Sequence, residues 1–280
     1  MPGLIRLEEI DMTQEERFAN RVVVTISGHV AEVRLDRPDK LNAIDPAMFE
    51  GLLQAGQFLS EQDRVRAVVL CGEGRMFCAG LDFASFAAMA GDAAAMEPLE
   101  TRTHGLSNRP QHACLQWREL PMPVIAAIQG GALGGGLQIA LGADIRLVTP
   151  DARLAIAEIR WGLVPDMGGC VVLPGLMRDD RIRDLTYSGR DVTGDEAVRL
   201  GLATRVEADP RAAALDMARA IAGRSPSAMR ASKRLLNQAA SDDTAAVLLA
   251  ESREQAALMG GSHQVEAVMA QMEKRPPIFD

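Results

Sequence analysis

The sequence lacks an excess of basic residues, and its few cysteines lack the spacing of metal ligands. Its 38 acidic residues outnumber the 30 lysines and arginines, so the net charge at neutral pH is −8. A protein that binds nucleic acid non-specifically needs a basic surface to displace counterions from phosphates, so we expect no nucleic-acid partner. Cys71, Cys78, Cys114 and Cys170 form no paired motif. We therefore expect no metal site, and reduced thiols of the kind found in cytoplasmic proteins.

The chain also lacks a secretion signal and an uninterrupted apolar run. The first residues are acidic, without the basic cluster and apolar stretch of a signal, and we interpret residues 1–20 as a loose leader. The most apolar stretch, residues 124–145, is interrupted by two glutamines, an aspartate and six glycines. A buried core explains this stretch better than a membrane span does, so we expect no membrane partner and a cytoplasmic location.

Several common catalytic motifs are absent as well. Gly134-x-Gly136 is followed by Ile139 where a dinucleotide-binding fingerprint needs a third glycine, and no P-loop lysine follows. The sequence contains neither a G-x-S-x-G elbow nor an H-E-x-x-H pair. These absences argue against dinucleotide binding, covalent serine chemistry and zinc chemistry.

The residues that are present alternate between strand and helix patterns. Residues 21–38 predict two strands around a Ser27-Gly28 turn, because apolar and charged residues alternate after the turn. Asp45 and Pro46 indicate the N-cap and the first position of a helix over residues 45–59. Further strands and a helix are predicted at residues 65–72, 122–130, 133–143, 145–149 and 153–158. Strand-strand-helix units thus recur up to about residue 173, which predicts an α/β fold with stacked turns.

The C-terminal part of the sequence is helical. Helix-start signals occur at Thr193-x-x-Glu196, Asp209-Pro210 and Ser225-Pro226. We divide the 280 residues into the leader, an α/β core over residues 21–207 and a helical region over residues 208–280. Apolar faces on the terminal helices would favour oligomer contacts. Within the core, residues 83–118 are rich in alanine, methionine, glycine and histidine, and we expect a mobile segment there.

Two glycine-bearing stretches could present backbone N–H groups to a ligand. "FCAGLDF", residues 77–83, follows a predicted strand, and "GGALGGGLQ", residues 130–138, opens a predicted helix. Each stretch leaves N–H groups without intrahelical partners and lets a ligand approach closely. Two such donors that converge would bind an oxyanion, whereas tight packing of turns on the sheet would explain the same glycines without a ligand.

Two acidic residues, Glu158 and Asp166, stand eight positions apart near the end of the core. Gly162, Pro165 and Gly168 exclude a continuous helix, so the chain can turn both carboxylates toward one cavity. Four apolar residues accompany the acids: Trp161, Leu163, Val164 and Met167. An apolar cavity would raise both carboxyl pKa values and suit proton transfer. The alternative is a pair of surface acids on a loop.

In this order, "RPDKLNAID", "FCAGLDF", "GGALGGGLQIALGADIRL" and "EIRWGLVPDMGG" resemble the motifs of the enoyl-CoA hydratase/isomerase family, or crotonase superfamily. The resemblance extends from about Arg21 to the terminal "MEKRPPIFD". It implies an α/β spiral of strand-strand-helix turns with a helical C-terminal trimerisation region, and a homotrimer or a dimer of trimers. It also implies an acyl-CoA thioester as substrate and no separate cofactor, because coenzyme A is part of the substrate.

The resemblance also assigns roles to particular residues. It implies that the N–H groups of Leu81 and Gly135 form an oxyanion hole for the thioester oxygen, in which each donor is worth roughly 3 kcal/mol of barrier. The expected coenzyme A side consists of Lys40, Leu41, Ala43, Ala79, Gly80 and Asp82, with Lys40 as the phosphate contact. Gln138 and Trp161 are expected to line the acyl site. We interpret His104, Arg109 and His112 as solvated loop residues.

The acids indicate the reaction. Hydratases of this family use two glutamates, and this sequence has Glu158 at the second position but Gln138 at the first. An amide can orient a water or a carbonyl, but it cannot exchange a proton at neutral pH. Asp166 matches a catalytic aspartate of the dienoyl-CoA isomerases, which usually carry another acid at the position of Gln138. We therefore predict double-bond isomerisation of an enoyl- or dienoyl-CoA by Glu158 and Asp166. Hydration by Glu158, with Gln138 orienting the water, is the first alternative, and a non-catalytic acyl-CoA binder is the second.

Overall fold

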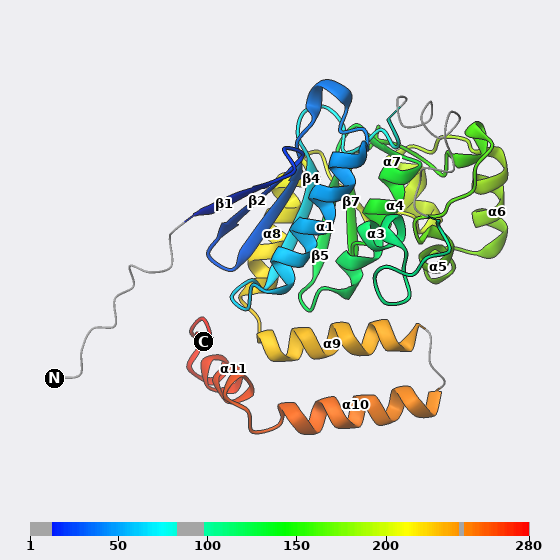
Figure 1. Cartoon of the computed structure of the whole chain (residues 1–280). Coiled ribbons are helices and arrows are strands. Elements are labelled where there is room, and N and C mark those ends of the chain that lie inside the picture. The colour runs from blue at the N-terminus through cyan, green and yellow to red at the C-terminus, as the bar shows by residue number, and fades with distance from the viewer. Residues whose placement is uncertain (1–12, 83–97, 241–243, 280) are drawn as a thin grey trace.

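The computed structural model describes residues 13–82, 98–240 and 244–279 (Figure 1). Its main sheet has seven strands in the order β1-β2-β3-β4-β5-β7-β9. The strands are β1 (Gln14–Phe18), β2 (Val22–Ser27), β3 (Val30–Leu35), β4 (Ala67–Gly72), β5 (Val124–Ile128), β7 (Ile145–Val148) and β9 (Arg205–Val206). The first three strands pair antiparallel, and from β3 onward all pairs are parallel. The α/β class predicted from the sequence is thus confirmed.

Strand β1 corrects the interpretation of residues 1–20 as a loose leader. Residues 14–18 pair with the whole length of β2, from Gln14 opposite Ile26 to Phe18 opposite Val22. The segment "QEERF" shows little alternation of apolar and polar residues, and only Phe18 is partly buried. It becomes a strand because β2 offers an unpaired edge and because Glu15 reaches Arg34 and Thr25 on the neighbouring strands. Residues 1–12 lie outside the described residues.

A second, smaller layer of parallel strands lies beside the main sheet. It consists of β6 (Gly131–Leu133) and β8 (Arg153–Ala155). Single bridges extend it, from Cys78 to Ala132 and from Leu154 to Val192. Each of β5 and β7 in the main sheet is therefore followed by a short strand in this second layer, and the chain advances as stacked turns. This arrangement agrees with the predicted strand-strand-helix repeat.

Helices cover both faces of the main sheet, with α8 on the side opposite α1 (Figure 1). Strand β4 is buried along its entire length: Val68 and Leu70 belong to the cluster beneath α1 (Pro46–Ser60), α3 (Arg109–Glu119) and α4 (Gly135–Leu141). Val69 and its neighbours Ala67 and Cys71 point to the opposite face, toward α8 (Pro210–Ala222). Side chains alternate across a strand, so a continuous apolar run is required where both faces are covered.

The predicted helix starts at residues 45, 209 and 225 are confirmed. Asp45 accepts a hydrogen bond from the Met48 N–H, Asp209 from Ala212 and Ser225 from Ala228. Thr193 likewise accepts from Glu196 N–H at the start of α7 (Gly194–Leu200). The remaining helices are η2 (Pro38–Lys40), η4 (Glu158–Trp161), α5 (Gly169–Val172), η5 (Leu173–Gly175) and α6 (Asp179–Ser188) in the core.

Helix α3 corrects the expectation that residues 83–118 form a mobile segment. Residues 109–119 are a helix with a reciprocal capping box, in which Asn108 and Gln111 each bind the other's backbone N–H. This cap is readable in the sequence "NRPQ", so the pattern was present but missed. Residues 83–97 lie outside the described residues.

The C-terminal region contains α8, α9 (Pro226–Ala239), α10 (Thr244–Leu258) and α11 (Ser262–Glu273). Helix α8 contributes Ala214, Ala218 and Ala222 to the core cluster on the sheet, so residue 207 does not separate two independently packed units. Helices α9 and α10 lie side by side at one end of the molecule (Figure 1). No helix in the described ranges combines the length and apolarity that crossing a bilayer requires.

Candidate active site

Backbone hydrogen bonds bring the two glycine-bearing stretches together. The Ile44 N–H donates to the Gly80 carbonyl at 2.8 Å, and Leu133 N–H donates to the Cys78 carbonyl at 3.1 Å. Residues 41–44, 78–82 and 131–135 therefore run next to one another in the second layer. A Cβ added to Gly80 would lie 2.6 Å from the Leu133 carbonyl oxygen and 3.9 Å from the Gly135 nitrogen. Only glycine permits this close approach.

The backbone N–H groups of Leu81 and Gly135 form no hydrogen bond within the described part of the chain. Gly135 is the first residue of α4, where the N–H group has no intrahelical acceptor. Gly134 holds the turn before Gly135 with φ 50° and ψ −121°, a conformation that favours glycine. The two N–H groups implied for an oxyanion hole thus lie on adjacent segments and are available to a ligand.

Glu158 lies next to this turn. It begins η4, directly after β8, and only 8% of the residue is exposed. One carboxylate oxygen, Oε1, accepts a hydrogen bond from Gln138 Nε2 at 2.7 Å. The other oxygen, Oε2, is buried and has no hydrogen-bond partner among the described residues. Burial raises the pKa of the Glu158 carboxyl, and hydrogen bonds that include the one from Gln138 oppose this rise. A carboxyl of this kind is suited to proton exchange.

Asp166 stands eight residues later, before the short helix α5. Its side chain keeps contact with solvent, yet the surrounding protein raises the pKa of its carboxyl through desolvation. The charge of Asp166 also raises the pKa of Glu158, so the two acids lie within electrostatic range. Glu158 is buried, whereas the side chain of Asp166 is exposed.

The predicted apolar cavity around the acids is wrong for three of its four residues. Met167 is buried, but Trp161, Leu163 and Val164 are 50%, 42% and 69% exposed. Gly162 is in the left-handed conformation at φ 70°, where it ends η4 and directs the following residues to the surface. Burial of Glu158 therefore comes from the packed core beneath it rather than from this loop. Trp161, predicted to line the acyl site, is the last residue of η4 and is half exposed.

Gln138 differs most from its predicted role as a substrate contact. Its residue is 4% exposed, on the buried face of α4. Its side-chain oxygen accepts hydrogen bonds from the N–H groups of Met167 and Gly169 at 2.9 and 3.0 Å, and its nitrogen donates to Glu158. The amide thus connects three parts of the protein, and both oxygen lone pairs are occupied.

The residues predicted for the coenzyme A side lie together. Lys40 is exposed at the end of η2, and Ala79 N–H donates to the Leu41 carbonyl at 3.0 Å. Ala43 and Gly80 belong to the same two neighbouring segments, because the Ile44 N–H donates a hydrogen bond to the Gly80 carbonyl. The carboxylate of Asp82 already accepts a hydrogen bond from Arg37 at 2.6 Å. Asp82 therefore holds the two segments together, which differs from the substrate contact expected of it.

Two residues of this region were missed by the sequence analysis. Arg37 joins Asp82 and the Ala43 carbonyl. Asn42 is fully buried at φ 55°, and its amide donates to the carbonyl oxygens of Glu73, Met76 and Phe77. Asparagine tolerates the left-handed conformation better than most residues. An asparagine in a segment that breaks a helix was therefore the sequence signal that could have identified Asn42.

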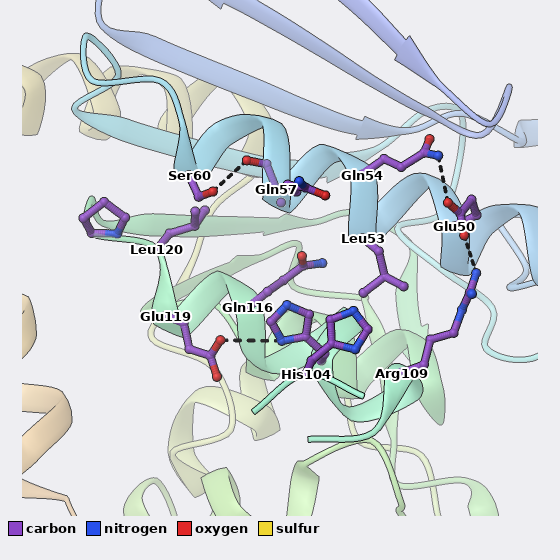
Figure 2. Close-up of a pocket in the computed structure, with 13 residues that line it drawn as sticks. Glu50, Leu53, Gln54, Gln57, Ser60, His104, Arg109, Gln116, Glu119 and Leu120 are labelled. Atoms are coloured by element: carbon purple, nitrogen blue, oxygen red, sulfur yellow. Dashed lines mark hydrogen bonds and ion pairs between the residues drawn. The ribbon is translucent and has the colours of Figure 1, made fainter. Parts of the chain in front are cut away.

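His104, Arg109 and His112 line a cavity of about 460 Å³ between α1 and α3 (Figure 2). The imidazoles of His104 and His112 stack with their centroids 4.4 Å apart. Arg109 forms an ion pair with Glu50, and His112 lies 3.5 Å from Glu119. The expectation of solvated loop residues is wrong for Arg109 and His112, because both belong to helix α3. His112 is also partly buried, and burial lowers its pKa. In the described part of the chain, no group of three histidine, cysteine or acidic side chains could hold a metal ion.

Comparisons with known proteins identify similar chains. The family model for enoyl-CoA hydratase/isomerase matches residues 25–280. A mitochondrial Delta(3,5)-Delta(2,4)-dienoyl-CoA isomerase of Mus musculus is 35% identical over 78% of this chain and 69% of its own length. A short-chain-enoyl-CoA hydratase of Clostridium acetobutylicum is 30% identical over 91% of this chain and 96% of its own length. The crystal structure of an enoyl-CoA hydratase from Bacillus anthracis superposes with a TM-score of 0.83 at 29% identity, covering 92% of this chain and 98% of that one.

Proposed function

Because the chain belongs to the enoyl-CoA hydratase/isomerase family and is an enzyme of that family, we propose that it shifts double bonds in an enoyl- or dienoyl-CoA. The observation that carries this proposal is the composition of the site. Two carboxyl groups with raised pKa values, Glu158 and Asp166, lie within electrostatic range, while a neutral amide occupies the position next to Glu158. Such a pair can remove a proton at one carbon and return one at another.

The proposed reaction uses the free backbone donors and both acids. The thioester oxygen binds the N–H groups of Leu81 and Gly135, which stabilise negative charge as it develops there. One carboxylate removes a proton from the acyl chain, and the C–H electron pair enters a conjugated enolate. The other carboxyl group, in its protonated form, donates its proton to a carbon further along the chain. The double bonds have then moved without gain or loss of atoms from the substrate.

The environment of Gln138 favours isomerisation over hydration. In a two-glutamate hydration, both side chains next to the substrate hold the attacking water. Here both lone pairs of the Gln138 oxygen accept backbone N–H groups, and one of its N–H groups is bound to Glu158. A water would have a single remaining amide hydrogen at its disposal and no base at position 138. The names of the relatives include both activities, so the choice rests on this site.

The experiment compares two substrates under identical conditions. Purified enzyme is mixed with a 2-enoyl-CoA or with a 3,5-dienoyl-CoA, and absorbance and products are followed. We expect the dienoyl substrate to gain the absorbance of a conjugated 2,4-dienoyl thioester. Loss of the 2-enoyl chromophore with faster formation of 3-hydroxyacyl-CoA would favour hydration instead. Tight binding of both esters with no turnover would indicate the non-catalytic acyl-CoA binder.

We also propose that the C-terminal helices mediate a homotrimer or a dimer of trimers. Helices α10 and α11 carry exposed apolar side chains, among them Leu248, Leu249, Val265, Val268, Met269 and Met272. Such side chains on a protein surface favour contact with another chain. Sedimentation equilibrium measures the mass directly, and a monomer at micromolar concentration would contradict this assignment.

The proposed location is the cytoplasm. Cys71, Cys78, Cys114 and Cys170 are all free thiols, as is usual in a reducing compartment. One of the similar proteins is mitochondrial, so the comparisons do not favour the cytoplasm. The proposed location therefore rests on the cysteines alone.

A further inference from the structure

Gln138 connects the two proposed acid–base groups. Its amide donates a hydrogen bond to the carboxylate of Glu158 and accepts one from the backbone N–H just after Asp166. The Met167 N–H that it binds belongs to the peptide group between Asp166 and Met167, so this hydrogen bond restrains the backbone that carries the aspartate. The second bond, to Gly169 N–H, fixes the same turn two residues later.

The orientation of the amide follows from its partners. Backbone N–H groups are donors only, so the group facing Met167 and Gly169 must be the side-chain oxygen. The NH₂ group must then face Glu158, and it donates to Oε1 at 2.7 Å. A donor at this position requires Oε1 to act as an acceptor. When Glu158 is protonated, this arrangement favours the proton on Oε2, the buried oxygen that has no hydrogen-bond partner among the described residues.

The glycine at position 169 is part of the same arrangement. A Cβ at Gly169 would lie 2.9 Å from the Gln138 side-chain oxygen, closer than real Cβ contacts occur. Gly169 starts α5 in an ordinary helical conformation that any residue can adopt. Glycine is needed there because a side chain would collide with the Gln138 amide, and not because of its backbone conformation. The amide can reach the turn because residue 169 has no side chain.

From these contacts we infer that Gln138 is a positioning residue, which directs Oε2 of Glu158 toward the substrate and sets the relative placement of Glu158 and Asp166. The inference rests on the proposed function, because it assigns Gln138 to the acid–base chemistry of the same site. It replaces the predicted role of Gln138 as a substrate contact. Gln138 acts through Glu158 and the turn, and it needs no contact with the acyl chain.

Electrostatics supply a measurable consequence. The hydrogen bond from Gln138 lowers the pKa of Glu158, whereas burial and the charge of Asp166 raise it. Cys114 is the other ionisable group coupled to this pair among the described residues, and burial keeps its thiol protonated. Removing the amide donor should therefore raise the Glu158 pKa further. If Glu158 must be ionised to accept a proton, activity would then begin at higher pH.

The test uses Gln138→Glu as the main variant. In its ionised form, the new carboxylate can still accept from Met167 and Gly169, so the turn stays held, but it cannot donate to Glu158 and adds a like charge. We expect kcat to fall about 10- to 100-fold, as loss of a hydrogen bond to a charged group predicts, with KM changed by less than about twofold. The acid limb of the pH profile should move to higher pH.

A second variant disturbs the amide without changing any polar group. Gly169→Ala places a methyl group against the Gln138 oxygen, and we expect kcat to fall by roughly three- to tenfold with the same direction of pH shift. Gly175→Ala is the matched control, because nothing lies within 4 Å of its added Cβ. Thermal melting confirms that each variant is folded. Normal kcat and an unmoved pH profile in both folded variants would overturn the inference.

A readout independent of turnover separates this inference from the proposed function. Carbon NMR of protein labelled at glutamate carboxyls follows the Glu158 signal, which is assigned by its loss in Glu158→Gln. A higher Glu158 pKa in Gln138→Glu than in the wild type supports the positioning role even if no enoyl- or dienoyl-CoA is turned over, in which case the proposed function fails. An equal pKa in both proteins overturns the inference whatever the substrate.

Discussion

Replacing Glu158 by glutamine should slow catalysis and, at the same time, stabilise the folded protein above the carboxyl pKa. Oε1 of Glu158 accepts from Gln138, and the glutamine oxygen can accept the same bond. The geometry is thus retained, but the group can no longer exchange a proton. Loss of a general acid–base residue lowers kcat by about 10²- to 10⁴-fold.

The stability change follows from the raised pKa of the Glu158 carboxyl in the folded state. Below the unfolded pKa, the group is neutral in both states and its burial carries no charge penalty. As pH rises through the folded pKa, the native state must hold a buried charge, and each pKa unit of difference costs about 1.4 kcal/mol. The amide in Glu158→Gln carries its own burial cost, but this cost does not change with pH.

Chemical denaturation of both proteins at about pH 4 and pH 8 isolates the charge effect. We expect the free energy of unfolding of Glu158→Gln, minus that of the wild type, to be larger at the higher pH, which means that the variant is relatively more stable there. The exposed residue Glu61, replaced by glutamine in the same way, should show no comparable difference between the two pH values. A Glu158→Gln variant that becomes relatively less stable as pH rises would refute the reasoning, because it would mean that the folded state prefers the ionised carboxyl.

Three further predictions address the oxyanion donors, the C-terminal region and the coenzyme A side. Gly134→Ala should lower kcat about 10²-fold and cost about 1–3 kcal/mol of stability, because φ 50° and ψ −121° strain any other residue and redirect the Gly135 N–H; an unchanged kcat would exclude Gly135 as a donor. Lys233→Met should destabilise the fold by about 3 kcal/mol in urea unfolding, because its buried ammonium lies 2.8 Å from Asp144 and the substitution leaves that carboxylate without its cation. A value near zero would show that the ion pair of Lys233 with Asp144 contributes little to stability. Lys40→Ala should raise KM for an acyl-CoA up to about fivefold, as expected for one exposed charge, without affecting a thioester that lacks the nucleotide; equal effects on both thioesters would place Lys40 elsewhere.

Most of the secondary structure could be predicted because its signals are local. Asp45 caps a helix that starts at the next residue. The hairpin predicted around Ser27-Gly28 forms with its turn at Gly28-His29, one residue later, because Ser27 still pairs with Val30. The errors arose where local signals were weak or overlooked. Strand β1 shows little alternation and forms only because the edge of β2 is available, and α3 was missed although its capping box is present in the sequence.

The site was predicted in part for the same reason. The resemblance implied roles for Glu158, Asp166, Leu81 and Gly135, and these roles stay predictions. The structure brings the segments of Leu81 and Gly135 next to each other and places the two acids within electrostatic range. The direction in which a side chain points is not a local property. Whether Trp161 lines a cavity or faces solvent depends on how Gly162 turns the chain, and the structure shows it half exposed.

Gln138 shows where the sequence reaches its limit. By itself, the sequence determined that a neutral amide stands where a second acid was expected and that two acids follow at residues 158 and 166. Only the tertiary structure decided what the amide does, because its partners lie 20 to 31 residues away in the chain. Those partners meet it through the stacking of α4 against the turn that begins α5. Residue type fixes which hydrogen bonds a side chain can make, whereas folding decides which groups come close enough to make them.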